Sequence, residues 1–192
     1  MRSPFHFIVE PVGGSRYDNV KSIGGIDFIT SSSKEDHKAS NRHAKVLATP
    51  IGYEGEVMPG DIVIVHHNVF KYYNDIKGNE RSGRAFLGEG IFLIDDDQFY
   101  LYKRDGDWQA HSRYCFVIPE KRQDNFIMKK LGTEEYLRGT LAYPNRELID
   151  KGLKKGDKVG FLPESEYEFQ IDDVTMYRMY SKNICLELNG DK

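Results

Sequence analysis

Short apolar runs, each closed by glycine, proline or an acidic turn, follow one another along most of the chain. They are too short for helices and rich in β-branched and aromatic residues, so they predict strands. In the first half of the chain these runs are residues 5–11, 44–50, 62–65, 90–95 and 98–103. Many short strands separated by glycine and proline predict an all-β protein of the barrel or sandwich type.

The second half of the chain repeats this pattern in the same order. Residues 114–119, 138–144, 154–161 and 169–180 match residues 5–11, 44–50, 58–65 and 92–102, respectively. We interpret the match as a tandem repeat of one small β-domain, with a first copy over residues 1–108 and a shorter second copy over residues 109–192. The polar residues 104–107 are the expected linker. Helical turns are expected only at residues 133–137 and 146–151.

A long polar loop, residues 13–43, interrupts the first copy. Its middle, residues 24–33, reads Gly-Gly-Ile-Asp-Phe-Ile-Thr-Ser-Ser-Ser, an apolar island with no helical or strand period. Loops of this length without structure of their own are usually functional or disordered. Because Ile26, Phe28 and Ile29 cannot be buried locally, the island predicts a docking segment. A packed Ω-loop, or a strand that covers the barrel, is the alternative interpretation.

Charge and composition narrow the classes of partner. The chain has 192 residues and a net charge of -3, which argues against nucleic acid, because phosphate neutralisation dominates that affinity. No apolar run approaches the ~20 residues needed to cross a bilayer, and residues 1–5 lack an apolar signal core. We therefore expect a cytoplasmic protein with no membrane partner. In that setting Cys115 and Cys185, the only two cysteines, are expected to be reduced thiols.

Side chains capable of chemistry are not grouped as catalysis or metal binding requires. His66 and His67 are adjacent, and on a strand they would face opposite sides, so they could not share one ion. The run Asp95-Asp96-Asp97 lacks the spaced ligands of a calcium loop, and the pair Asp172-Asp173 at the matching place of the second copy favours hairpin turns. No Ser-His-acid grouping or glycine-rich phosphate loop stands out. We therefore expect no enzyme activity, no metal and no cofactor.

Taken in order, these residues resemble the GroES-type co-chaperonins, the ten-kilodalton chaperonin family. In the first copy the resemblance rests on an opening strand, a long loop with Gly24-Gly25-Ile26, the strand Lys45-Val46-Leu47-Ala48, the segment Pro59-Gly60-Asp61-Ile62-Val63-Ile64-Val65, and an Ile-Asp-Asp hairpin at residues 94–96. In the second copy residues 155–159 and 171–188 are similar to the C-terminal half of the family. The second copy has no Gly-Gly-Ile island between Pro119 and Arg138.

The resemblance implies two tandem, small, irregular GroES-like β-barrels. It implies a co-chaperonin that caps a GroEL-type chaperonin ring through a mobile loop and assists ATP-dependent protein folding. Family members dock a Gly-Gly-Ile-Val-Leu segment of that loop between two helices of the chaperonin. Carried over by position, the chaperonin-binding residues of this chain are Gly24, Gly25, Ile26, Phe28 and Ile29.

The chain also departs from the family in three respects. Asp27 stands where the family has an apolar residue, although in an extended segment Ile26 and Phe28 share one face and Asp27 lies on the other. Residues 51–57 are too short for the roof hairpin of bacterial members. The tandem copy and the long segment 66–93 favour a divergent, bacteriophage-encoded relative that acts in the host cytoplasm.

Ring assembly follows from the resemblance too. Family members form seven-membered rings, so we expect a homo-oligomer. The specific hypothesis is a heptamer in which the first barrels form the ring. The alternative function is a non-catalytic viral structural, assembly or adaptor protein that uses the same barrel for another partner.

Overall fold

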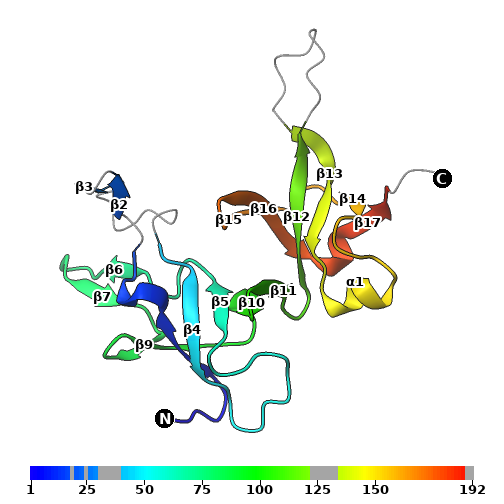
Figure 1. The fold of residues 1–192 in the computed structure, drawn as a ribbon. Helices are drawn as coiled ribbons and strands as arrows, with labels where there is room; N and C mark the ends of the chain where they lie inside the picture. The colour runs from blue at the N-terminus through cyan, green and yellow to red at the C-terminus, as the bar shows by residue number, and fades with distance from the viewer. Residues whose placement is uncertain (18–19, 24–25, 30–39, 122–133, 189–192) are drawn as a thin grey trace. The chain divides into compact units, whose positions relative to one another are not determined.

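The computed structural model describes residues 1–17, 20–23, 26–29, 40–121 and 134–188. The chain divides into two compact units, Met1–Asp107 (unit 1) and Trp108–Lys192 (unit 2). Nearly all the regular structure in both units is β-strand (Figure 1), so the predicted all-β class is confirmed. Among the residues described, no helix is long and apolar enough to span a membrane.

Unit 1 is built on one large antiparallel sheet. Its order is β11-β10-β5-β4-β1-β9-β8, where β11 (Asp107–Ala110) begins at the unit boundary. Two further pairs, β2-β3 and β6-β7, form separate two-stranded sheets. The elements are β1 (Phe7–Pro11), the 3-10 helix η1 (Val12–Gly14), β2 (Val20–Ile23), β3 (Ile26–Ile29), β4 (His43–Ala48), β5 (Ile62–Val65), β6 (Tyr72–Asn74), β7 (Glu80–Ser82), β8 (Phe86–Gly88), β9 (Ile91–Ile94) and β10 (Phe99–Arg104).

Unit 2 is built on a six-stranded antiparallel sheet of order β15-β16-β12-β13-β14-β17. Its elements are β12 (Tyr114–Lys121), β13 (Glu134–Tyr143), α1 (Arg146–Asp150), β14 (Lys158–Phe161), β15 (Tyr167–Ile171), β16 (Val174–Tyr180), the 3-10 helix η2 (Ser181–Asn183) and β17 (Ile184–Glu187).

One of the two predicted helical turns is confirmed. Helix α1 begins after Asn145, whose side chain accepts a hydrogen bond from the backbone N–H of Leu148 at 3.0 Å, as a helix N-cap does. The other prediction, at residues 133–137, is wrong. Residues 134–137 belong to β13, and the Cα of Glu134 pairs with that of Lys121 on β12.

The two main sheets have the same strand topology. When the strands that both units possess are numbered in chain order, unit 1 contributes β1, β4, β5, β8, β9 and β10, and unit 2 contributes β12 to β17. Both sheets then read fourth-fifth-first-second-third-sixth. Within the described residues, the first sheet differs by β11 at its edge, and unit 1 differs by the β2-β3 pair between its first and second strands and by the β6-β7 pair between its third and fourth.

Two bulges fall at equivalent places in the two sheets. β1 has a register shift between Ile8 and Val9 where it pairs with β4, and β12 has one between Phe116 and Val117 where it pairs with β13. The sixth strands are also shifted alike, because one residue, Tyr100 on β10 and Cys185 on β17, is skipped in the pairing with the third strand. The equivalence of the two units is therefore fixed residue by residue.

This register corrects part of the sequence match. The expected match of residues 92–102 with 169–180 is wrong by one strand, because β9-β10 is equivalent to β16-β17 and β8-β9 to β15-β16. The acidic turn at residues 95–97 is consequently not the counterpart of Asp172-Asp173. Both are short acidic turns between apolar strands, which is why the sequence pattern confused them.

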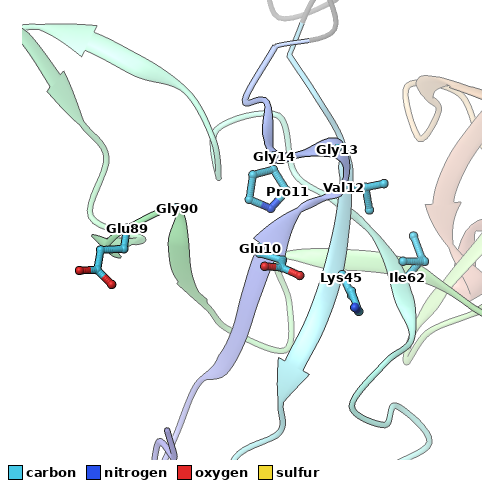
Figure 2. A pocket seen from close by; sticks show the side chains of 9 residues that line it. All are labelled: Glu10, Pro11, Val12, Gly13, Gly14, Lys45, Ile62, Glu89 and Gly90. Carbon is cyan, nitrogen blue, oxygen red and sulfur yellow. The ribbon is translucent and has the colours of Figure 1, made fainter.

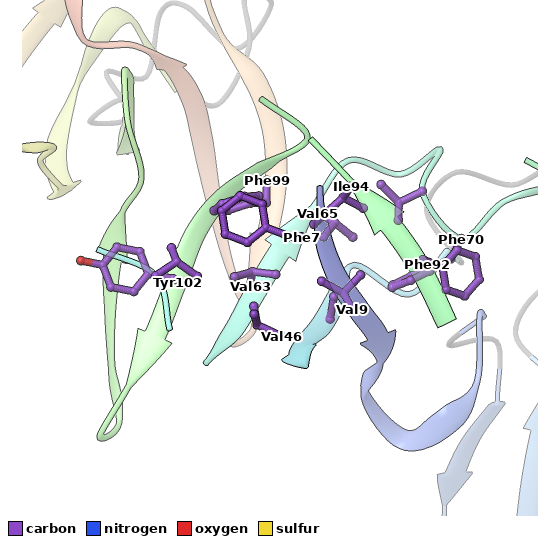
Figure 3. Packing of buried hydrophobic residues seen from close by; sticks show 13 residues of the cluster. Phe7, Val9, Val46, Val63, Val65, Phe70, Phe92, Ile94, Phe99 and Tyr102 are labelled. Carbon is purple, nitrogen blue, oxygen red and sulfur yellow. The ribbon is translucent and has the colours of Figure 1, made fainter. Parts of the chain in front are cut away.

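Equivalent positions also form the two cores. In unit 1 the cluster includes Phe7, Val9, Val46, Val63, Val65, Phe92, Ile94 and Phe99 (Figure 3). In unit 2 the equivalent residues are Cys115, Val117, Leu141, Val159, Phe161, Tyr177, Met179 and Ile184, and all of them belong to or pack against its cluster. Both sheets have open strand orders within the described residues, so the finer expectation of two closed barrels is not confirmed.

The expected linker is a tight turn. Asp105 and Gly106, between β10 and β11, have φ angles of 54° and 99°. Positive φ at both central residues is typical of the two-residue hairpin turns in which Asp-Gly is common.

Candidate functional site

The predicted docking loop, residues 13–43, leaves and re-enters unit 1 through a hydrogen-bonded base. We call Arg16, Tyr17, Ser40 and Asn41 the loop root. Tyr17 and Ser40 form an antiparallel bridge, and the backbone N–H of Asn41 donates to the carbonyl of Arg16 at 3.0 Å. The two chain segments of the loop are therefore hydrogen-bonded to each other where they leave the unit.

Side chains of the root close this base further. The Asn41 amide donates to the carbonyls of Val12 at 2.9 Å and Ser15 at 2.8 Å, and its Oδ1 accepts from the backbone N–H of His43 at 2.9 Å. The Ser40 hydroxyl donates to the carbonyl of His67 at 3.0 Å. These bonds give partners to backbone carbonyls in the segments that follow β1 and β5 and to the first backbone N–H of β4.

Arg16 holds the root against the body of unit 1. Its guanidinium lies 4.2 Å from the ring centres of both Tyr72 and Phe86 and 4.8 Å from that of Phe92. Its Nη1 donates to the hydroxyl of Ser82 at 2.8 Å. A guanidinium within about 6 Å of an aromatic face is attracted by the ring quadrupole. Arg16 therefore ties the loop to β6, β7, β8 and β9 together.

Tyr17, like Arg16, contacts the β6-β7 hairpin. Its hydroxyl accepts the backbone N–H of Tyr72 at 3.0 Å, and the two rings stack with centres 6.0 Å apart. Sequence reasoning missed all four root residues. They lie at the polar margins of the loop, and their partners are far away in the chain, so one sequence carries no signal for the pairing.

The predicted docking residues lie on a hairpin. Ile26, Phe28 and Ile29 belong to β3, whose Cα positions pair with those of Ile23, Lys21 and Val20 on β2, respectively. Asp27, the departure from the family, pairs with Ser22. The loop thus contains strand structure that the sequence pattern did not predict. Gly24 and Gly25, the two residues between these strands, lie outside the described residues.

The β2-β3 hairpin is a sheet of its own. Among the described residues its two strands pair with each other and with no third strand. A two-stranded hairpin is marginally stable by itself in water, and a third strand or a packing partner is needed for independent stability. The hairpin is therefore an element that a partner surface would stabilise.

A surface pocket lies beside the start of the loop (Figure 2). Its volume is about 450 Å³, and Glu10 and Lys45, which are paired across β1 and β4, lie in it together with Val12 and Ile62. The complete lining is Glu10, Pro11, Val12, Gly13, Gly14, Lys45, Ile62, Glu89 and Gly90. None of these nine residues is a serine, threonine, cysteine or histidine, so the lining supplies no hydroxyl or thiol nucleophile and no imidazole base; its ionisable side chains are Glu10, Lys45 and Glu89.

The other groups singled out in the sequence do not form a reactive cluster. His66 and His67 follow the end of β5, and their ring centres are 4.1 Å apart, so the expectation that they face opposite sides of a strand is wrong. Cys115 is buried, Cys185 is exposed, and both are free. Within the part of the chain that is described, no three His, Cys, Asp or Glu side chains gather as a metal site requires.

No protein-family model matches the chain. A search of curated proteins also finds no match.

Proposed function

We propose that this chain is a co-chaperonin-type cap that consists of two tandem GroES-like domains. The first domain docks on a chaperonin ring through residues 24–29 and assists ATP-dependent folding in the cytoplasm without catalysing a reaction itself. The observation that carries the proposal is a loop with a firmly hydrogen-bonded root and, at its centre, a hairpin that pairs with no other described strand and bears the Gly-Gly-Ile-Asp-Phe-Ile sequence.

A two-stranded hairpin suits reversible docking for a physical reason. Its ordering is completed only when the partner covers it, so part of the contact energy offsets lost conformational entropy. Burying one large aliphatic or aromatic side chain contributes about 1.5–3 kcal/mol, so two anchors such as Ile26 and Phe28 give a weak single site. Several copies held in one ring then bind by avidity, which raises the overall affinity without any new contact.

A homo-oligomer is part of this proposal. Seven chains that each contribute their first unit would match a seven-membered chaperonin ring, with the second units outside the contact ring. Native mass spectrometry of the isolated protein tests this point. A mass other than that of seven chains would overturn the heptamer.

The function itself is tested by retention of the full chain on an immobilised chaperonin ring with ATP. The Ile26→Ser/Phe28→Ser variant should lose at least about tenfold in retention, because both apolar anchors are removed. The matched control is Ile51→Ser/Leu87→Ser, which removes two exposed apolar side chains of unit 1 outside the loop and should bind as the parent does. Equal binding of parent and loop variant, or no binding of the parent, overturns the proposal and favours the adaptor alternative.

A further inference from the structure

Unit 1 has a second insertion besides the docking loop. Its third and fourth strands, β5 and β8, are separated by residues 66–85, which contain the β6-β7 hairpin. In unit 2 the equivalent strands, β14 and β15, are joined by residues 162–166 alone. The hairpin is therefore an addition to a sheet topology that is complete without it, and it occurs in the same unit as the docking loop.

The turn of this hairpin is held by one carboxylate. Asp75 Oδ1 accepts the backbone N–H groups of Lys77 and Asn79, both at 2.9 Å, and Oδ2 accepts from the side chains of Asn79 and Arg81, both at 3.3 Å. The backbone bond from Asn79, followed by those from Lys77 and the Asn79 and Arg81 side chains, lowers the pKa of Asp75, so the carboxylate stays ionised and keeps these bonds at neutral pH.

This well-ordered turn presents an apolar side chain to solvent. Ile76 lies at its tip and is fully exposed, and Tyr73 on β6 is 54% exposed. A single exposed apolar residue is unremarkable by itself. Here the residue sits in a turn whose conformation is already fixed, so little further ordering would be needed if it entered a partner's pocket.

The hairpin and the docking loop share one support. Arg16 and Tyr17 of the loop root contact Tyr72 and Ser82, which lie at the two inner ends of the hairpin. The direction in which the hairpin leaves unit 1 is thus coupled to the position of the loop root. The base of the docking loop and the base of the hairpin are therefore neighbours on unit 1.

We propose that the β6-β7 hairpin is a second contact element for the chaperonin that binds the docking loop, with Ile76 inserted in an apolar site on that chaperonin. The inference rests on the proposed function. The hairpin is basic, since residues 71–84 include Lys71, Lys77, Arg81 and Arg84 but only Asp75 and Glu80 as acids. The apolar site that accepts Ile76 is accordingly one with an acidic rim.

The test measures binding of the full chain to the chaperonin ring with ATP, at low and at high salt. Ile76→Ser should weaken binding about tenfold, while Ile76→Leu, which keeps the apolar volume, should bind as the parent does. Ile51→Ser is the matched control, because Ile51 is an isoleucine of the same unit, also in a turn and 54% exposed. Added salt should weaken the parent, because a basic hairpin on an acidic rim is screened.

The outcomes separate this inference from the proposed function. If the parent binds, the Ile26→Ser/Phe28→Ser variant does not, and Ile76→Ser binds as the parent does, the hairpin is no contact element and only the inference is overturned. If the parent itself fails to bind, the proposed function fails and the inference fails with it. A loss with Ile76→Ser that Ile51→Ser reproduces also overturns the inference, because the effect would then not be specific to the hairpin.

Discussion

Units 1 and 2 share one sheet topology and two equivalent bulges but differ, within the described residues, in what is inserted between their strands. Unit 1 has the docking loop with β2-β3 and the β6-β7 hairpin, whereas unit 2 joins β14 to β15 with five residues, 162–166. The loop root adjoins both extra elements of unit 1. It closes the base of the docking loop, and its Arg16 and Tyr17 contact the β6-β7 hairpin. The sheet is therefore the common scaffold of the two units. Function in this protein is to be sought in the elements inserted between the strands of unit 1.

The two cores fill the same positions with different side chains. Phe7 in unit 1 corresponds to the smaller Cys115, while Val46 and Val65 correspond to the larger Leu141 and Phe161. Cores tolerate such exchanges when total volume and patterning are kept. Substitutions at equivalent positions therefore test whether the two units respond alike.

The largest expected difference between the units is at the first core position of the fifth strand, Phe92 in unit 1 and Tyr177 in unit 2. Phe92 is buried, with ring centres 4.7 Å from Phe70 and 5.3 Å from Phe86. Its counterpart Tyr177 is half-buried at the edge of its cluster. Phe92→Ala should lower the free energy of unfolding of unit 1 by about 3–5 kcal/mol, and Tyr177→Ala should lower that of unit 2 by about 2 kcal/mol.

Hydrogen exchange followed by peptide mass spectrometry checks this prediction, because it reads the opening free energy of each unit in the intact chain. The unsubstituted unit in each variant serves as the internal control. Equal losses at the two positions would contradict the assigned difference in burial.

A smaller asymmetry is expected at the turn before the third strand. In both units an aspartate accepts the backbone N–H three residues earlier at 2.8 Å, Asp61 from Met58 and Asp157 from Lys154. Asp61 also accepts two hydrogen bonds from Arg104, at 2.9 and 2.7 Å. Asp61→Ala should therefore cost about 3 kcal/mol and Asp157→Ala about 1–2 kcal/mol, because only the first leaves a cation without its partner.

Chemical denaturation of the full chain, with hydrogen exchange to assign the unit, measures both losses. Asp61→Asn keeps an acceptor for Met58 but removes the charge that Arg104 faces, so it should fall between the parent and Asp61→Ala. If Asp61→Asn is instead as stable as the parent, the backbone hydrogen bond rather than the ion pair is the larger contribution, and the difference expected from Asp157 is contradicted.

The sequence predicted the parts of the fold that depend on local pattern. Short apolar runs rich in β-branched and aromatic residues located β1, β4, β5, β9, β10, β12 and β14, because such side chains pack well on the surface of a sheet. It did not align the last strands of the two units, because Phe99 and Ile184 occupy one position with different sizes and only pairing register identifies them. The apolar island at Ile26 was evident because the residues that flank it are polar. The contacts of Arg16 with Phe86 and Phe92 were not, because they join segments distant in the chain.

An equal loss of stability in the two units is expected at the glycine of the turn before the third strand. Gly60 and Gly156 have φ angles of +99° and +95°, and a Cβ built on either would meet no atom within 4 Å. Their N–H groups donate to Val46 at 2.7 Å and Leu141 at 2.8 Å. Gly60→Ala and Gly156→Ala should therefore each cost about 1–2 kcal/mol through backbone strain alone. Thermal unfolding of the two variants measures this, and a difference above about 1 kcal/mol would show that the turns are not equivalent.

The smallest effect concerns a core position where unit 2 has a thiol and unit 1 has a phenylalanine. Phe7 corresponds to Cys115, and burial raises the pKa of the Cys115 thiol from its ordinary value of 9.0 to about 12. Between these two values the unfolded chain releases the proton and the folded chain keeps it, so stability falls as the pH rises above 9. The Cys115→Ala variant lacks this contribution. Its stability deficit relative to the parent, measured by denaturation under reducing conditions, should shrink by about 1 kcal/mol between pH 8 and 9.5. A deficit that stays constant with pH would mean that the thiol is solvated in the folded state, and that Cys115 does not replace Phe7 as a buried core residue.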